Sequence, residues 1–347
     1  MLNTVSKDAI SWLPDEVLAD ILSRVPTKLA ASTSVLSKRW RNLFALVHNL
    51  DFDASDLLQP EEDEEERDVM RESFRDFVDR TLALQCGSPI KKFSLKCVIH
   101  MASELDCPAD KEYGEVFLPS ELFKSKTLIC VTCFFLVVRA CSEGYPYCIS
   151  SRTIKKLSVH YDCKFAVDTM QSMSFDAPSL VSLDYSDYAL AVYEQVNLES
   201  LVEARLDLRY TDRVISRCVK RGLFLPVFNK LVSLSFGSKN KRGWKLLPYL
   251  LKQCPKLETL IIQGLDGYTG DVTMRPFQVK VFHILGYGGT AKELEHLKSI
   301  IGESKCLELV QVEVAQGIAV DDAILSQIYR DLKTHLGVSS KCKIIVA

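Results

Sequence analysis

Leu231-Val232-Ser233-Leu234-Ser235-Phe236 has leucines at its first and fourth positions and an aromatic residue at its sixth. The same spacing recurs in Leu257/Leu260/Ile262, Leu180/Leu183/Tyr185 and Ile154/Leu157/Val159. With a looser copy at Leu201, these units start at positions 154, 180, 201, 231 and 257, which are 26, 21, 30 and 26 residues apart. A pattern that returns at such intervals indicates one structural unit used repeatedly.

From about residue 90 onward, short apolar runs follow one another at similar intervals. They are Phe93–Val98, Leu128–Val138, Ile154–Val159, Leu180–Tyr185, Leu201–Leu208, Leu231–Phe236, Leu257–Ile262, Val279–Leu285, Leu307–Val314 and Ile344–Val346. Leucine-rich repeats have a period of roughly 20–29 residues and an L-x-x-L-x-L core, and each repeat contributes one strand to a shared sheet. We therefore expect an irregular leucine-rich-repeat solenoid of the α/β class.

Alternate side chains of such strands lie on one shared face, because successive residues of a strand point to opposite sides. The residues expected on this face are mixed in polarity, without one dominant charge, which suits a protein or small polar ligand and suits equally a face that is only solvated. Those that we take as candidate substrate contacts are Lys156, His160, Asp184, Glu203, Arg205, Asp207, Thr259 and Gln263. Their neighbours on the face are Ser158, Ser182, Ser186, Ser233, Ser235 and Ile261.

The end of the chain alternates strands and helices. Gly286-Tyr287-Gly288-Gly289 interrupts the pattern, and Thr290 with Glu293 has the spacing of a capping box at the start of a helix. A helix over Leu294–Ile301, a strand at Leu307–Val314, a helix around Asp321–Leu336 and a final strand at Lys343–Val346 follow. We expect this segment to close the end of the sheet, as solenoids require.

Residues 9–50 have the pattern of a compact helical unit. Pro14 suits the first position of a helix whose apolar residues are Val17, Leu18, Ile21 and Leu22. Pro26 ends it, Thr27 is expected to cap a second helix through Ser34, and Ser37 a third. The third helix is expected to turn Trp40, Leu43 and Phe44 inward and to leave Lys38, Arg39 and Arg41 in solvent. About forty residues bury too little surface to be stable alone, so this unit is either a docking module or the first layer of a larger domain.

The acidic run Glu61–Glu66 predicts a solvated loop or linker, since six consecutive carboxylates repel one another. Phe74, Phe77, Val78 and Leu82 then recur at helical spacing, which predicts an amphipathic helix over residues 68–84.

Composition excludes several classes of protein. The chain has 347 residues and a net charge of -2, so it lacks the basic excess expected of a nucleic-acid-binding protein. Its start has no secretory signal, and the apolar stretch Ile129–Val138 is about half the roughly 20 residues of a membrane span, so we expect a cytoplasmic or nuclear protein without a membrane partner. The 12 cysteines are then reduced, and Cys130-Val131-Thr132-Cys133 has no second pair with zinc spacing, which favours core packing over a metal site.

The sequence contains no motif for catalysis or nucleotide binding. Gly286-x-Gly288-Gly289 lacks the rest of a dinucleotide fingerprint, and there is no P-loop, H-E-x-x-H or G-x-S-x-G. The six histidines are dispersed and none adjoins a nucleophile. We expect a protein without catalytic residues, cofactor or metal.

Two strings in the N-terminal unit resemble a known family. Leu13-Pro14-Asp15-Glu16 leading to Pro26-Thr27-Lys28, and Ser34-Val35-Leu36-Ser37-Lys38-Arg39-Trp40-Arg41-Asn42-Leu43, closely resemble the plant-type F-box. Pro178–Tyr185 and Cys254–Leu260 are similar to the repeats of the same family, and residues 289–295 to its FBD element, so the chain resembles an F-box/FBD/LRR-repeat protein. Lys7-Asp8-Ala9 departs from the family, which often has Asp-Arg before Ile10.

The resemblance implies four regions and a division of labour. These are an F-box of three helices at 8–50, an acidic linker and helix at 51–90, a leucine-rich-repeat-like domain at 91–275 and an FBD-like α/β cap at 276–347. It implies a substrate-recognition subunit of an SCF-type ubiquitin ligase, which docks on a Skp-family adaptor and through it on a cullin and RING subunit, and works by proximity. The implied adaptor contacts are Leu13, Pro14, Val17, Leu18, Ile21 and Leu22, with Pro26, Leu36 and Trp40 as contacts or core, and Trp40 is the one expected in the core.

Two other functions stay open from the sequence. The F-box can bind its adaptor in a protein that does not promote ubiquitination. The shared face of the sheet can instead hold a small ligand, as a sensor does.

Overall fold

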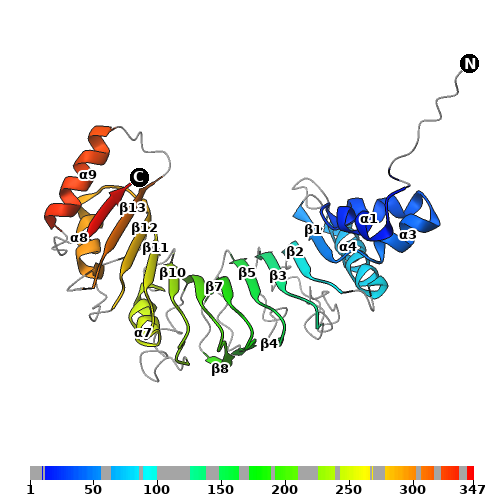
Figure 1. Cartoon of the computed structure of the whole chain (residues 1–347), viewed down its shortest axis with the longest axis horizontal. Helices are drawn as coiled ribbons and strands as arrows, with labels where there is room; N and C mark the ends of the chain where they lie inside the picture. The colour runs from blue at the N-terminus through cyan, green and yellow to red at the C-terminus, as the bar shows by residue number, and fades with distance from the viewer. Residues whose placement is uncertain are drawn as a thin grey trace, which may run out of the picture.

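A long curved sheet dominates the structure, with a helical module at one end and a pair of helices at the other (Figure 1). The computed structural model describes residues 10, 12–55, 64–85, 89–99, 126–137, 148–163, 172–188, 192–209, 226–238, 243–265, 268, 278–301, 306–315, 322–335 and 342–347. The prediction of an α/β fold with N-terminal helices and a parallel sheet is confirmed.

The sheet has 11 strands, all parallel, and each pairs with the strand of the neighbouring repeat. In spatial order they are β1 (Asn49–Asp53), β2 (Lys92–Ile99), β3 (Cys130–Val137), β5 (Lys156–Cys163), β7 (Ser182–Tyr188), β9 (Glu203–Arg209), β10 (Ser233–Gly237), β11 (Thr259–Gln263), β12 (Val281–Tyr287), β13 (Leu309–Val314) and β14 (Lys343–Val346). Each of the ten predicted apolar runs overlaps one of the strands from β2 to β14. Stacking in chain order is the arrangement expected of a solenoid.

Three strands outside the main sheet were not predicted, and neither was β1 within it. β4 (Cys148–Ser150), β6 (Ser172–Asp176) and β8 (Val192–Asn197) form a separate parallel sheet on the outer side of the arc (Figure 1). Phe175 of β6 packs edge-on against Tyr185 of β7, with ring centroids 5.7 Å apart. This contact shows that Tyr185 faces the outer layer, so its neighbours Asp184 and Ser186 lie on the opposite, inner face of the main sheet.

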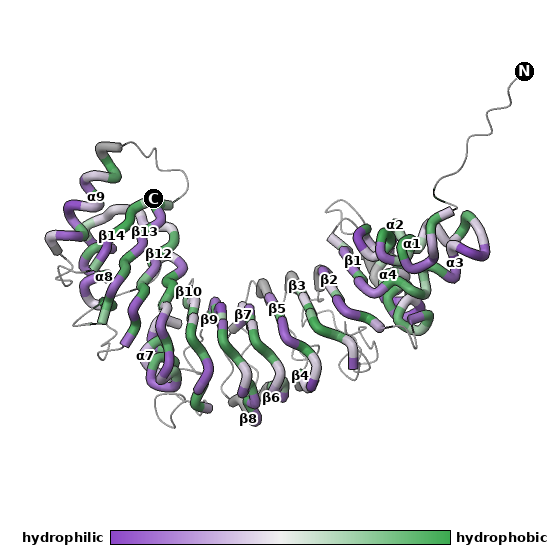
Figure 2. The backbone as a smooth tube through the Cα atoms, viewed as in Figure 1, coloured by the Kyte–Doolittle hydropathy of each residue, from purple (hydrophilic) through white to green (hydrophobic). Residues whose placement is uncertain are grey.

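Helices replace the outer strands farther along the solenoid. A short 3-10 helix η3 (Gly243–Leu246) and α7 (Leu247–Lys252) follow β10, and the Trp244 ring contacts Phe236 and Tyr268 edge-on, with centroid distances of 5.5 and 5.3 Å. Tyr268 in turn meets the His296 ring at 4.8 Å. These edge-on ring contacts make the core continuous from the repeats into the C-terminal region. Figure 2 shows the alternation of apolar and polar residues along the strands.

The C-terminal alternation of strands and helices is confirmed. α8 (Ala291–Ile301) lies between β12 and β13, and α9 (Asp322–His335) between β13 and β14. Thr290 and Glu293 form the predicted capping box, since Glu293 N donates to Thr290 Oγ1 at 3.2 Å and Thr290 N donates to Glu293 Oε2 at 2.9 Å. Gly286 and Gly289 have φ of +73° and +75°, a conformation that a side chain disfavours, which explains the glycines before this helix.

The N-terminal module consists of α1 (Asp15–Leu22), α2 (Thr27–Ser32), the 3-10 turn η1 (Thr33–Val35) and α3 (Lys38–Phe44). Ser37 caps α3 as predicted, accepting from Trp40 N. Pro14 is the residue before α1 and not its first, which is Asp15. Thr27 begins α2 and does not cap it, because its buried Oγ1 accepts a hydrogen bond from Asp51 N of β1 at 2.7 Å.

α4 (Glu64–Leu84) begins inside the acidic run, so the prediction of a loop is wrong for Glu64, Glu65 and Glu66, and residues 61–63 lie outside the described residues. Carboxylates in the first turn of a helix are favoured by the helix dipole, which offsets their repulsion. Phe77 of α4 meets Phe52 of β1 edge-on at 5.7 Å, and Gln85 Nε2 donates to Phe44 O at 2.8 Å. α4 therefore fastens the helical module to the first strand.

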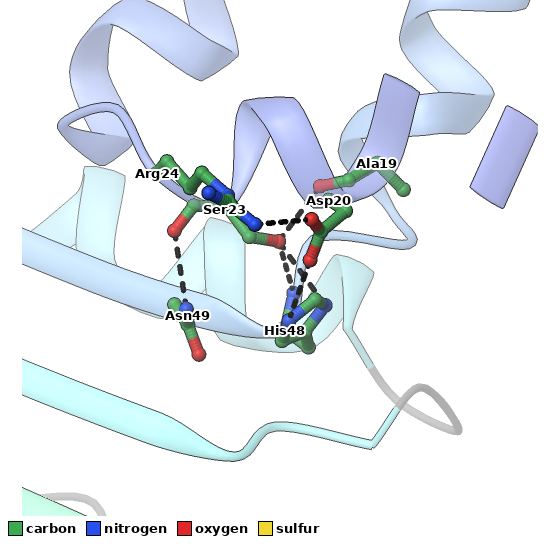
Figure 3. Close-up of polar contacts among 6 residues, drawn as sticks. All are labelled: Ala19, Asp20, Ser23, Arg24, His48 and Asn49. Atoms are coloured by element: carbon green, nitrogen blue, oxygen red, sulfur yellow. Dashed lines mark hydrogen bonds and ion pairs between the residues drawn. The ribbon is translucent and has the colours of Figure 1, made fainter. Parts of the chain in front are cut away.

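A polar network joins α1 directly to the sheet (Figure 3). Ser23 Oγ donates to Ala19 O at 2.7 Å and accepts from His48 N at 3.1 Å, with His48 Nδ1 3.2 Å away. Asn49 Nδ2 donates to Ser23 O at 3.2 Å. Because Ser23 has a single hydroxyl hydrogen, which it gives to Ala19, both His48 contacts use it as an acceptor. The helical module and β1 thus share hydrogen bonds as well as core.

Candidate functional site: the exposed apolar surface of the helical module and the inner face of the sheet

α1 has two apolar stripes, and only one of them is buried. Leu18 and Leu22, four residues apart, are 2% and 4% exposed in the core. Val17 and Ile21, also four apart, are 43% and 48% exposed. A helix that is apolar on two sides needs a second surface to cover the outer one.

Other exposed apolar side chains lie close to this stripe in the sequence. Eight of the 17 large hydrophobic side chains that are exposed in the described structure fall within residues 10–46. We call six of them the apolar surface of the helical module: Trp12, Val17, Ile21, Leu29, Val35 and Leu36. Such a concentration of exposed apolar groups is typical of an interaction site.

The predicted adaptor contacts divide into three groups. Pro14, Val17, Ile21, Pro26 and Leu36 are exposed. Leu13 and Trp40 are partly buried and pack against the core. Leu18 and Leu22 are corrected to core residues, because their stripe of α1 faces inward.

Trp12, Leu29 and Val35 were missed as exposed apolar residues. The exposure of Leu29 follows from its place in α2. The buried residues of this helix are Thr27 and Ala30, three residues apart, so Leu29 lies off the buried stripe. Arg39 is also corrected, since it is half-buried and bonded where we expected solvent. Its Nη2 donates to Leu13 O at 2.6 Å and to Asp15 Oδ1 at 2.7 Å, which fixes the start of α1 against α3.

The register of the sheet brings all eight predicted substrate-contact residues to the inner face. Lys156, Glu203 and Thr259 share one row across the strands, as do Asp184 and Arg205, while His160, Asp207 and Gln263 share a third. Lys156, Glu203 and Arg205 are exposed, and the other five are half-buried. The prediction that these side chains share a face is confirmed; their contact with a substrate stays a prediction.

Neighbouring charges on this face contact one another. His160 Nε2 lies 3.5 Å from Asp184 Oδ2, and Arg205 Nε lies 4.0 Å from Asp184 Oδ1. Ser186 Oγ donates to Asp207 Oδ2 at 3.3 Å, and the buried Asp207 Oδ1 has no hydrogen-bond partner among the described residues. The face is thus charged and open at β7 and β9.

β10 contributes small residues to the same face. Gln263 Nε2 donates to Ser235 Oγ at 2.9 Å, and a Cβ added at Gly237 would lie 2.9 Å from Gln263 Cβ. Gln263 therefore lies over β10, and only glycine leaves room for it there.

The described residues give no support for metal or membrane chemistry. They contain no group of three His, Cys, Asp or Glu side chains arranged for a metal ion. Cys130 and Cys133 occupy opposite faces of β3, three residues apart, so they do not point at one shared ion. None of the described helices has the length and apolar character needed to cross a bilayer.

Comparison with known proteins identifies both parts of the chain. Residues 10–51 match the F-box domain, which is the helical module with the first strand. The chain is 43% identical to the F-box/LRR-repeat protein At3g60040 of Arabidopsis thaliana over an alignment of 443 positions, which spans 99% of this chain and 98% of that protein. It is 41% identical to the F-box/LRR-repeat protein At1g06630 of the same plant, spanning 90% of this chain and 99% of that one.

The structure and the comparisons indicate the same family. The structure has a helical module with an exposed apolar surface and a parallel solenoid, and the relatives match along nearly their whole length. The chain belongs to the F-box/LRR-repeat proteins.

Proposed function

We propose that this protein is the substrate-recognition subunit of an SCF-type ubiquitin ligase. The F-box binds a Skp-family adaptor, which connects it to a cullin and a RING subunit, and the inner face of the sheet holds the substrate protein. The chain itself supplies no catalytic group. Its contribution is proximity, which raises the effective concentration of a substrate lysine near the ubiquitin donor.

The observation that carries the proposal is the apolar surface of the F-box. Val17, Ile21, Val35 and Leu36 are between 43% and 85% exposed in a module that the core already fixes from its other side. Covering such side chains gains free energy at about 25 cal/mol per Å² of apolar area. An adaptor with a complementary groove is the partner that this surface fits.

The rigid connection between the two regions supports the same proposal. Thr27 and Ser23 accept hydrogen bonds from Asp51 N and His48 N, which ties the helices to β1, and Phe52 of β1 packs against Phe93 of β2 in the proposed substrate-binding sheet. A substrate on the sheet is then held at a fixed orientation to the adaptor. We further propose that the C-terminal segment from β12 to β14 is the FBD element of this family.

Binding of the full-length protein to a purified Skp-family adaptor tests the proposal. Val17→Asp/Ile21→Asp is expected to weaken binding at least a hundredfold, about 2.7 kcal/mol, because it places two carboxylates in an apolar interface. Val227→Asp is the matched control, since Val227 is 53% exposed outside the F-box, and it should bind as the wild type does. Circular dichroism melting confirms that the variants fold.

Equal adaptor binding by the double variant and the control contradicts the docking assignment. Reconstitution with cullin, RING subunit and conjugating enzyme then separates a ligase receptor from a plain binding protein. Ubiquitin transfer to a bound partner that depends on Val17 and Ile21 is the expected result, and binding without transfer contradicts the ligase role.

A further inference from the structure

Four lysines lie together at the start of two strands, β2 and β5, which flank β3. Lys92 and Lys156 are the first residues of β2 and β5, and Lys91 and Lys155 directly precede them. Ile129 of the strand between them donates its N–H to Lys91 O at 2.9 Å, and Ile129 O accepts from Lys155 N at 2.9 Å. The two lysine pairs are therefore two strand spacings apart, about 10 Å. We call these four residues the basic patch.

Among the described residues, no carboxylate is paired with the basic patch. All four lysines are exposed, and none forms an ion pair with any residue in the described ranges. Lys96, farther along β2, differs, because its Nζ lies 3.3 Å from Asp53 Oδ2. Uncompensated cations held this close repel one another, so an anionic partner would be favoured there.

Carboxylates occupy the next two strands of the inner face. Asp184 of β7 and Glu203 and Asp207 of β9 form what we call the acidic patch, and the exposed Arg205 lies among them on the same face of β9, 4.0 Å from Asp184. Asp184 is shared between His160 and Arg205, whereas Glu203 is exposed and has no ion-pair partner within the described part of the chain. Lys156 and Glu203 lie in one row, two strands apart, again about 10 Å.

The charges of the inner face are therefore segregated into a basic pole and a pole in which three carboxylates outnumber the exposed Arg205. We propose that this face binds an extended segment of a substrate protein in which a cluster of acidic residues adjoins a cluster of basic ones. An extended chain rises about 3.3 Å per residue, so a segment crossing from Lys92 to Glu203, about 20 Å, needs about six residues. This inference rests on the proposed function and specifies the class of substrate.

A protein segment fits these charges better than a nucleic acid. The basic patch is bounded by Asp51 and Asp53 of β1 on one side and by the acidic patch on the other. A long polyanion would have to lie over carboxylates within one or two strand spacings. A chain that carries both signs can match both poles.

Fluorescent synthetic peptides of about nine residues test the proposal on the full-length protein. One peptide has a block of glutamates followed by a block of lysines, and a second has the same residues in alternation. We expect the block peptide to bind about tenfold more tightly, which is 1.4 kcal/mol, and to lose affinity as salt is added. Equal affinity of the two peptides, or no measurable binding of the block peptide, overturns the proposal.

Charge reversal locates the site. Lys92→Glu/Lys156→Glu should remove the preference for the block peptide. Lys292→Glu/Lys298→Glu, which changes the net charge equally on exposed positions of α8, should retain it. Loss of the preference in both variants, or in neither, overturns the assignment to the inner face.

Adaptor binding measured on the same samples separates this inference from the proposed function. The charge-reversed protein should bind the adaptor normally, and Val17→Asp/Ile21→Asp should bind the block peptide normally. A protein that binds the adaptor but does not distinguish the peptides refutes the substrate class alone.

Discussion

The F-box surface and the inner face of the sheet are both open, but they differ in chemistry. The first presents Trp12, Val17, Ile21 and other apolar side chains, while the second presents segregated charges on β2, β5, β7 and β9. An apolar surface gains affinity from burial, which is not directional and discriminates little between partners. Such a surface suits a partner that is always the same. Segregated charges add little affinity but discriminate between partners. Under the proposed function, the molecule would separate a strong contact with a constant adaptor from a selective contact with the substrate.

The two regions nevertheless share one core. Phe52 of β1 is 1% exposed and contacts both Phe77 of α4 and Phe93 of β2, each at 5.7 Å. Neighbouring units of a solenoid stabilise one another. A substitution that destabilises the core at Phe52 should therefore destabilise both the F-box and the adjoining strands.

Phe52→Ala should cause the largest loss of stability, at about 3–5 kcal/mol of unfolding free energy, since it leaves a cavity between α4 and the first two strands, next to the F-box. Hydrogen exchange should accelerate in α1 and β2 together. Phe282→Ala, at an equally buried position of β12, should accelerate exchange only near β11 to β13. Unchanged exchange in α1 of the Phe52 variant would mean that the two regions are energetically separate.

Trp12→Ala tests whether the apolar surface of the F-box binds the adaptor. Trp12 is 81% exposed, so its removal should change the stability by less than about 0.5 kcal/mol. Adaptor affinity should fall by about 2 kcal/mol, because buried tryptophans dominate interfaces. Tyr249→Ala on α7, at a side chain 43% exposed, serves as the control in the same titration. Adaptor affinity equal to that of the wild type would exclude Trp12 from the interface.

Ser23→Ala tests the hydrogen-bonded connection between the two regions. It leaves the His48 N–H without its acceptor, which should cost about 1–2 kcal/mol in urea denaturation. Ser32→Ala removes an exposed hydroxyl that bonds only to Leu29 O in its own helix, and should cost less than about 0.5 kcal/mol. Similar losses in the two variants would show that the network in Figure 3 adds nothing specific.

The repeating leucines made the main sheet predictable, because each strand buries one side in the same way. β1 was missed although Leu50 and Phe52 alternate with Asp51 and Asp53 as in a strand, because it is short, lacks the leucine template and precedes an acidic segment. β4 precedes the first copy of the template, β6 and β8 lie between copies, and none of the three has leucine spacing of its own.

The adaptor contacts were predicted less well for a different reason. Val17 and Ile21 have the same spacing and polarity as Leu18 and Leu22, and the sequence does not say which stripe faces the core. The choice depends on the contacts of α1 with α3 and, through Ser23, with His48 and Asn49 at the start of β1, which no local pattern encodes. The charge poles were missed similarly, because Lys92 and Lys156 are 64 residues apart and meet only through the register of β2, β3 and β5.

The smallest expected effect concerns pH at the connection between the two regions. Burial, with the nearby Lys91 and Lys92 acting against the opposing Asp20, lowers the pKa of His48 below its ordinary value of 6.5. The neutral ring is therefore favoured in the folded protein, so its contribution to stability is complete above about pH 6.5 and is lost as the pH falls through the lowered pKa.

Thermal melting between about pH 7.5 and pH 5 should accordingly show a loss of stability on acidification that His48→Asn reduces. Burial, followed by Lys292, also lowers the pKa of His296, so His296→Phe should reduce the loss separately while keeping the ring contact with Tyr268. The two variants differ in what they do to adaptor binding. Only His48 lies within the F-box, so only its variant should make adaptor binding less sensitive to acid. The same pH sensitivity of adaptor binding in both variants would place the titrating group elsewhere.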